Sequence, residues 1–88
     1  MVKNPLEKIR TKIDAIDDQI IDLLGERFQW VEQVAELKKK QGTMVYQPGR
    51  EEVILKRILE RGVKLGLNPL LLQALFIQIF AVSKREQR

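Results

Sequence analysis

The 88-residue sequence contains neither cysteine nor histidine. Without cysteine, disulfide bonds, thiol nucleophiles and zinc fingers are excluded. Without histidine, the usual general base and the serine-type catalytic triad are excluded as well. Any catalysis by this chain must therefore rely on arginine, lysine, carboxylate, amide or hydroxyl groups.

Long hydrophobic runs are also missing. The N-terminal sequence MVKNPLEKIR lacks the apolar core of a signal peptide. The longest apolar stretch, residues 69–82, is too short to span a bilayer and contains Gln73 and Gln78. These absences favour a cytoplasmic protein, and the length predicts one domain over residues 1–88. A formal net charge of +4 predicts attraction to an anion, which is either nucleic acid or a small carboxylate.

The first predicted helix is unusually long and runs from Pro5, with Asn4 as its N-cap, to Gln41-Gly42. Its apolar residues alternate in steps of three and four, as in a coiled coil: Leu6, Ile9, Ile13, Ile16, Ile20, Leu23, Trp30, Val34 and Leu37. About 36 residues form a rod of roughly 54 Å, whereas a compact globule of this size is roughly 31 Å across. Unless Gly25 kinks the helix, its overhanging apolar seam predicts an intertwined homodimer.

Two shorter helices follow a loop that ends with the turn signal Pro48-Gly49. The second helix is predicted from about Arg50 to Leu65, with Gly66 as its stop. The third begins at Asn68-Pro69 and is apolar on most faces through Val82, which predicts that it is the most buried helix. The fold class is therefore all-α, with three helices.

Arg27 interrupts the apolar seam of the first helix between Leu23 and Trp30. Burying an unpaired guanidinium is costly, so Arg27 needs an anionic partner. That partner is either an internal carboxylate, such as Glu51 or Glu60, or a bound anion. The sequence pattern alone leaves both alternatives open.

Two further cations on this helix are candidates for an anion site. Lys38 follows Arg27 by eleven residues, about 1,100° of helix rotation, so both project from one face roughly 16 Å apart. Arg10 lies about 100° off that face and would reach a site on a partner chain more easily. The plainer alternatives are a solvated helix end for Lys38, which suits the helix dipole, and a surface arginine for Arg10.

Polar residues also mark the ends of the other two helices. The stripe Phe76, Phe80, Ser83 and Gln87 has coiled-coil spacing and adds a hydroxyl and an amide to an apolar face. Such a pair is more often the polar end of a helix than a site. Arg50-Glu51 opens the second helix, where Glu51 also has the plain role of interacting with the helix dipole.

These residues in combination resemble the all-helical class of chorismate mutases over nearly the whole chain. The resemblance is carried by Ile9-Arg10, the segment IDAIDDQIIDLLGER at 13–27, Lys38, the turn 48–51, Ser83 and Gln87. It implies a domain-swapped homodimer with two shared active sites inside the bundle, and no cofactor or metal. The implied substrate is the dianion chorismate, which rearranges to prephenate by an intramolecular pericyclic step. That step needs orientation and charge placement, and it needs no proton transfer.

The resemblance also implies roles for individual residues. Arg27 of one chain and Arg10 of the other correspond to the arginines that hold the substrate carboxylates, a task that suits the guanidinium. Lys38 and Gln87 correspond to the pair that donates hydrogen bonds to the ether oxygen. Negative charge grows on this oxygen as the C–O bond breaks, so these donors bind the transition state more strongly than the ground state.

The remaining implied site residues surround the substrate. Glu51 corresponds to the residue that binds the substrate hydroxyl, and Arg50 and Ser83 correspond to the polar groups around the carboxylates. Gln47 departs from the pattern, because relatives carry aspartate at that position. Its backbone could still contact the hydroxyl, so Gln47 is included among the substrate-binding residues.

Two rival functions remain at this point. An isochorismate-pyruvate lyase would share the fold, the arginines and Lys38, although the Arg50-Glu51 pair favours the mutase. From a different class, a non-catalytic basic helical dimer could bind nucleic acid or another protein. Against that reading, 12 acidic residues are interspersed with the 16 basic ones, and no nucleic-acid recognition motif is present.

Overall fold

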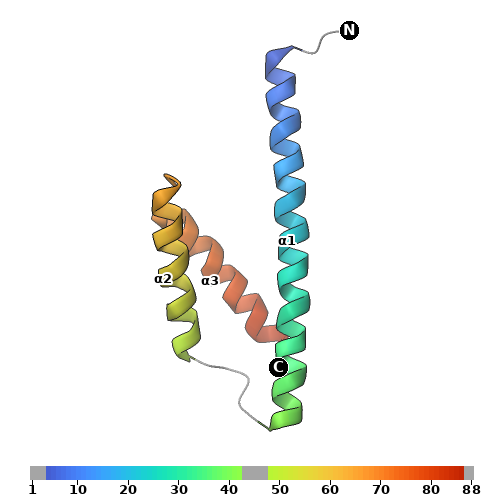
Figure 1. Cartoon of the computed structure of the whole chain (residues 1–88), viewed down its shortest axis with the longest axis vertical. Coiled ribbons are helices and arrows are strands. Elements are labelled where there is room, and N and C mark those ends of the chain that lie inside the picture. Colours follow the sequence, from blue (N-terminus) through green and yellow to red (C-terminus); the bar gives the residue numbers. More distant parts are fainter. Residues whose placement is uncertain (1–3, 43–47, 87–88) are drawn as a thin grey trace. The chain divides into compact units, whose positions relative to one another are not determined.

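The computed structural model describes residues 4–42 and 48–86 of the chain. Within these residues three helices follow one another, α1 (Pro5–Gln41), α2 (Pro48–Lys64) and α3 (Pro69–Glu86) (Figure 1). The predicted all-α class and helix order are confirmed there, and α2 begins two residues earlier than predicted because proline suits the first turn of a helix. The chain divides into two units, Met1–Trp30 and Val31–Arg88, with the boundary inside α1.

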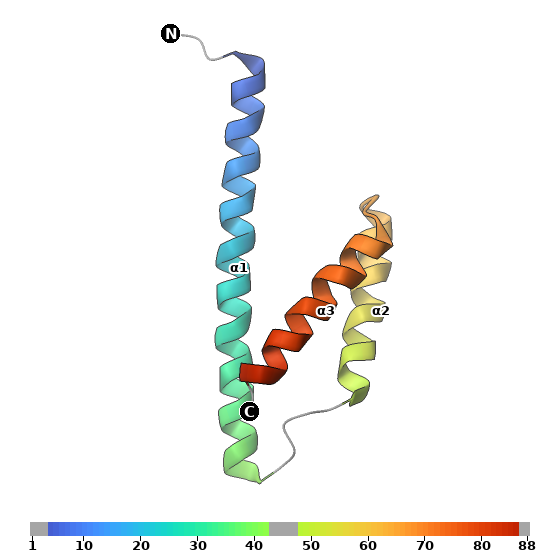
Figure 2. The ribbon, with the colours of Figure 1, turned by 180° about the vertical axis from the view of Figure 1, so that it is seen from behind.

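Helix α1 is continuous over 37 residues, including Gly25 (Figure 2). Its start is capped as predicted, because the Asn4 side-chain oxygen Oδ1 accepts hydrogen bonds from the backbone N–H of Leu6 at 2.7 Å and of Glu7 at 3.4 Å. Its end is marked by Gly42, which has a φ of 70°. A left-handed conformation of this kind favours glycine and stops the helix.

The apolar seam of α1 is exposed along its whole length in the protomer. Each of the nine apolar residues that define it keeps between 42% and 62% of its surface accessible. A second apolar stripe, which the seam prediction did not include, is better covered: Leu24, Phe28 and Val31 are half-buried and Ala35 is buried. Helix α1 therefore has two apolar faces, and the predicted seam is the one that lacks cover.

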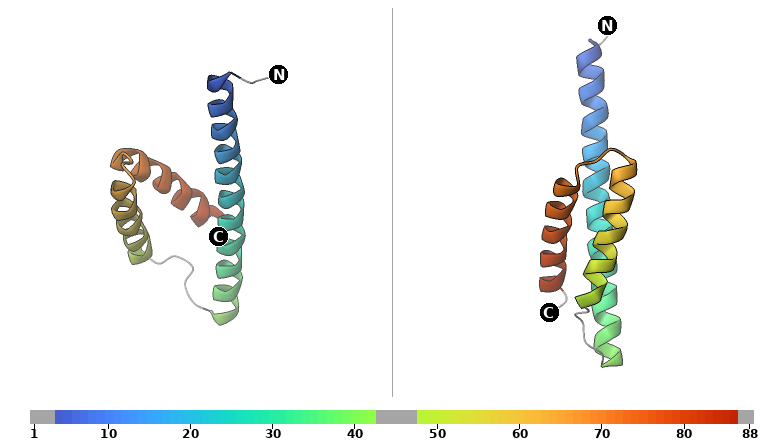
Figure 3. Two further views of the ribbon diagram at one scale, coloured as in Figure 1. Left: turned by 45° about the horizontal axis from the view of Figure 1, so that its top comes forward. Right: turned by 90° about the vertical axis from the view of Figure 1, so that its left-hand side faces the viewer.

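Helices α2 and α3 form a hairpin and pack against each other. With increasing distance from the turn that joins them, the two helices diverge (Figures 1 and 3). The turn is closed by hydrogen bonds from Leu67 N–H to the Gly62 carbonyl at 2.9 Å and from Gly66 N–H to the Val63 carbonyl at 3.1 Å. Gly66 has a φ of 76°, so the predicted stop is a Schellman cap. The Asn68 Oδ1 then accepts from Leu70 N–H at 2.8 Å and caps α3.

The buried side chains come mainly from α3, as its apolar composition predicts. Leu72, Ile79, Phe80 and Ser83 are buried on one face of this helix, whereas the described part of α2 buries Ile54 and Gly62. The opposite face of α3 stays apolar but exposed, with Leu70 at 72% accessibility. No helix within residues 4–42 and 48–86 is both long and apolar enough to cross a membrane.

Gly62 of α2 is buried against Leu72 of α3, and the structure predicts that a side chain at residue 62 is harmful. A Cβ at this position would overlap the Cδ1 of buried Leu72. Overpacking of this kind costs about 1–3 kcal/mol, whereas replacing a helical glycine by alanine otherwise gains about 0.5–1 kcal/mol. We therefore expect Gly62→Ala to lower the free energy of unfolding by about 1 kcal/mol, measured by urea denaturation.

Gly25→Ala is the matched control, because a Cβ at Gly25 meets no atom within 4 Å. It should raise the free energy of unfolding by about 0.5–1 kcal/mol through helix propensity alone. Adding Leu72→Ala to Gly62→Ala should relieve the overlap, so the double variant should lose less stability than the sum of the single variants. Equal effects of alanine at both glycines would contradict this account of the hairpin.

Candidate active site

The predicted site residues are distributed over both units of the chain. Arg10 and Arg27 belong to the first unit, and Lys38, Arg50, Glu51 and Ser83 belong to the second. Gln47 and Gln87 lie outside the described residues.

Ser83 is a buried polar residue on the apolar face of α3. It keeps 7% of its surface accessible, and its Oγ donates a hydrogen bond to the Ile79 carbonyl at 2.7 Å. Phe80, one turn earlier, is equally buried, and its ring lies 6.1 Å from that of Phe76 with a tilt of 58°. The predicted stripe thus faces inward. Since the hydroxyl donor is used within the helix, Ser83 would have to rotate to donate to a carboxylate.

Glu51 differs from the neighbouring charged residues of α2 in being half-buried, whereas Arg50 and Glu52 are exposed. It lies three and seven residues before Ile54 and Ile58, so its carboxylate shares the inward face of α2. Its place in the first turn also suits the helix dipole. Glu51 lies in the first turn of α2 and Ser83 in the last turn of α3, so both are remote from the turn that joins the two helices.

Lys38 is distinguished from the lysines that follow it in the last turn of α1. It is half-buried, whereas Lys39 and Lys40 are exposed. The three lysines share the same favourable position relative to the helix dipole, so the dipole does not explain the difference. The partial withdrawal of Lys38 from water favours a site role over a solvated helix end.

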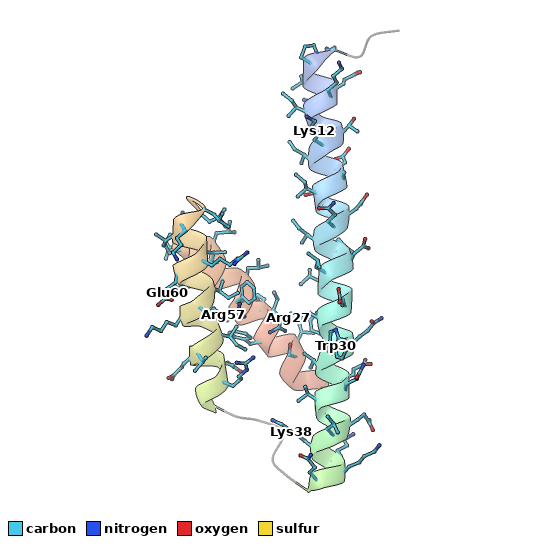
Figure 4. The ribbon with its side chains drawn as sticks, in the orientation of Figure 1. Lys12, Arg27, Trp30, Lys38, Arg57 and Glu60 are labelled. Atoms are coloured by element: carbon cyan, nitrogen blue, oxygen red, sulfur yellow. The ribbon has the colours of Figure 1, made fainter. Side chains whose placement is uncertain are left out.

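Arg27 is half-buried on the seam of α1, next to the exposed Trp30 (Figure 4). Arg10 is exposed, as expected both for a surface arginine and for a residue that serves another chain. Arg27, Lys38, Glu51 and Ser83 each have an interaction partner in the protomer. The sequence pattern identified Arg27 through the interrupted seam, Lys38 through its spacing from Arg27 and Ser83 through the apolar stripe of the third helix. It gave no role to the ring pair beside Ser83.

The described residues are thus helical, with arginines and a half-buried lysine on the long first helix, a half-buried glutamate on α2 and a buried serine on α3. Residues 9–88 match the family model described as chorismate mutase type II. The chain belongs to this family, as the resemblance of its sequence predicts.

Individual relatives agree with this assignment. The chain is 31% identical over 89% of its length to the T-protein of Enterobacter agglomerans and 33% identical over 98% to the bifunctional chorismate mutase/prephenate dehydratase of a Buchnera aphidicola strain. It is 43% identical over 60% of its length to the chorismate mutase of Methanocaldococcus jannaschii. The matches span 21%, 22% and 54% of these relatives, so the chain corresponds to a part of each.

The place of Arg27 in an apolar seam predicts the effect of removing it. If the guanidinium holds a substrate carboxylate, Arg27→Ala should lower the rate of substrate turnover by about 100-fold or more. The melting temperature of Arg27→Ala should differ little from that of wild type, because the substitution removes a charge from an apolar surface. The turnover rate of Arg27→Lys should lie between the rates of wild type and Arg27→Ala, since lysine keeps the charge but loses the bidentate geometry.

A structural ion pair would give the opposite result. Removing one partner of a buried pair costs about 3–5 kcal/mol. A large fall in melting temperature, with normal kinetics in the fraction that remains folded, would rule out the substrate-binding role of Arg27.

Proposed function

We propose that this chain is a chorismate mutase that converts chorismate to prephenate in aromatic amino-acid biosynthesis. The observation that carries the proposal is the withdrawal of Lys38, Glu51 and Ser83 from water, on three different helices, at the positions that the family pattern implies. The chemistry of these groups suits chorismate, because Lys38 can donate to its ether oxygen, Glu51 can accept from its hydroxyl and Ser83 can donate to one of its two carboxylates.

The mechanism that suits these residues is orientation combined with charge stabilisation. Arg27 holds a carboxylate of the bound substrate, and Glu51 accepts a hydrogen bond from its hydroxyl. Lys38 and Gln87 donate to the ether oxygen, so that they stabilise the charge that develops as the C–O bond breaks and the C–C bond forms. No general base enters this scheme, and it is compatible with a sequence that has no histidine.

We further propose that the protein works as an intertwined, domain-swapped homodimer with two shared sites. The exposed seam of α1 supports this arrangement, because nine large apolar residues spaced as in a coiled coil form a surface that favours another helix. In such a dimer Arg10 of one chain binds a substrate carboxylate in the site that contains Arg27 of the other. The cytoplasmic location stays a prediction of the sequence.

The direct test of the activity is the loss of chorismate absorbance on addition of the purified protein, with prephenate identified as the product. The rival lyase would release salicylate from isochorismate instead. A relative that is 27% identical over 75% of this chain is named 4-amino-4-deoxychorismate mutase, so that amino analogue belongs in the same assay. A protein that leaves chorismate unchanged would contradict the proposal, whatever it does to the other two substrates.

The dimer predicts the behaviour of Trp30, the single tryptophan of the chain. Trp30 is 59% exposed in the protomer, so covering the seam should shift its fluorescence maximum to shorter wavelength. We expect Ile20→Lys, which puts a charge on the seam, to shift the maximum back to longer wavelength and to abolish turnover.

Ala15→Lys is the control for this experiment, because it adds the same charge about 140° around the helix from Ile20. It should leave both the fluorescence and the activity unchanged. A wild-type protein that light scattering identifies as a folded monomer at micromolar concentration would refute the dimer and the shared sites together.

Gln87 allows a test of the catalytic step through pH. A neutral amide donates its hydrogen bond at every accessible pH, whereas the glutamate of Gln87→Glu donates to the ether oxygen only when it is protonated. Its anion would also repel the charge that develops there. We expect kcat of Gln87→Glu to be higher at acidic pH and to fall as pH rises, measured between about pH 4 and 8. A flat profile at the wild-type rate would remove Gln87 from the catalytic pair.

A further inference from the structure

Helix α2 carries a row of cations on one side. Arg57, Arg61 and Lys64 follow Arg50 by seven, eleven and fourteen residues, which places all four within an arc of about 60° around the helix. All four side chains are exposed. We call Arg50, Arg57, Arg61 and Lys64 the α2 cationic stripe, and Figure 4 shows Arg57 near its middle.

The acidic residues of α2 lie outside this arc. Glu51 faces inward, about 100° from Arg50, and Glu52 lies about 200° around the helix. Glu60 flanks the stripe, about 40° from Lys64, and offsets at most one of the four positive charges. The stripe therefore keeps a net positive charge along about 21 Å of helix.

The inward contacts of α2 do not account for these cations. The buried and half-buried apolar residues of α2, Ile54, Leu55, Ile58, Leu59 and Gly62, lie about 40° to 180° around the helix from Arg50, so the stripe borders this inward face without being part of it. A surface helix that needed charge only for solubility would be served by mixed signs, as along α1, where Asp14, Asp17, Asp18 and Asp22 follow Lys8, Arg10 and Lys12. A one-sided stripe instead produces a directed field.

Arg50 connects the stripe to the proposed active site, since it is both the first cation of the row and a predicted substrate-binding residue. The substrate of the proposed reaction is a small dianion. According to Coulomb's law, a single cation at a distance of about 10 Å strengthens the binding of a dianion roughly four-fold in unscreened water. Arg57 lies about 10 Å along the helix from Arg50, so it is close enough to act on a bound or approaching dianion.

We propose that Arg57, Arg61 and Lys64 gather the dianionic substrate beside Arg50 and so lower KM without contacting the reacting atoms. They are positioning residues, and their action depends on charge rather than on the geometry of the guanidinium. This proposal rests on the proposed chorismate mutase function. It extends the proposed function to a part of the molecular surface that the substrate encounters before it binds in the active site.

Ionic strength separates this role from a structural one. The Debye length is about 30 Å at 0.01 M salt, longer than the stripe, and about 8 Å at 0.15 M. We expect the variant Arg57→Gln/Arg61→Gln/Lys64→Gln to have a KM about five-fold higher than wild type at 10 mM ionic strength and less than about two-fold higher at 150 mM. Its kcat should equal that of wild type at both ionic strengths.

Two control variants sharpen the experiment. Arg57→Lys/Arg61→Lys keeps every charge, so its KM should match wild type at both ionic strengths. Lys56→Gln removes a charge beside Arg57 in the sequence, but Lys56 lies about 100° around the helix from Arg57 and outside the stripe. The effect of Lys56→Gln on KM should therefore be smaller than the effect of Arg57→Gln. Trp30 fluorescence of each variant reports whether the assembly is intact.

The outcomes are distinguishable. A wild-type protein that does not consume chorismate would refute the proposed function and remove the substrate that the stripe needs. An active wild-type enzyme with the same KM as the triple glutamine variant at 10 mM ionic strength would overturn the stripe proposal alone. A glutamine variant whose Trp30 emission shifts to longer wavelength would also overturn it, because the stripe would then be an interface between chains.

Discussion

The exposed apolar seam of α1 is the constraint on which the other features of this protein depend. A single helix of 37 residues cannot bury a coiled-coil surface against a hairpin whose helices have 17 and 18 residues. The single chain accordingly leaves the nine apolar residues of the seam accessible. Arg27 lies on that seam, so in the proposed dimer the chain that covers the seam would also complete the surroundings of Arg27. The proposal thus links folding, assembly and substrate binding through one helix face.

The chemistry proposed for the site agrees with what the sequence lacks. A rearrangement within one molecule needs its ends held together and its developing charge stabilised, and both tasks suit arginine, lysine and amides. The half-burial of Lys38 beside the exposed Lys39 and Lys40 shows how the fold can select one cation from a run of three. Partial removal from water strengthens the interaction of such a cation with a ligand, because it lowers the local dielectric constant.

The sequence predicted those features of the fold that arise from local rules. Asn4 was identified as a cap, Gly66 as a stop and Asn68-Pro69 as a helix start, because side-chain acceptors and left-handed glycine act within one turn of the chain. The inward direction of Ser83 followed from its spacing relative to Phe80. The covered stripe on α1 was missed because it contains the small residue Ala35, and its burial depends on tertiary contacts that periodicity does not specify.

The roles of the site residues needed the resemblance to a family as well as the pattern. Periodicity identified Arg27 as misplaced in a seam, but it could not decide between a carboxylate of the chain and one of a ligand. Glu51 carried an equally good local explanation in the helix dipole, and only its half-burial on the inward face distinguishes it from Glu52. Charge and burial become specific evidence when a side chain is compared with its immediate neighbours.

The contact between Gly62 and Leu72 is the point about which a change in the angle between α2 and α3 would act. Glu51 lies eleven residues from Gly62, an arm of about 16 Å along α2. A tilt of about 10° at this contact would move the Glu51 end of α2 by about 3 Å, which is about the length of a hydrogen bond and enough to break one. A small change in packing near the turn would therefore become a large change in the spacing of polar groups at the far end of the hairpin. Through such a tilt, substitutions at residues remote from a ligand would adjust the distances between the polar groups of the proposed site.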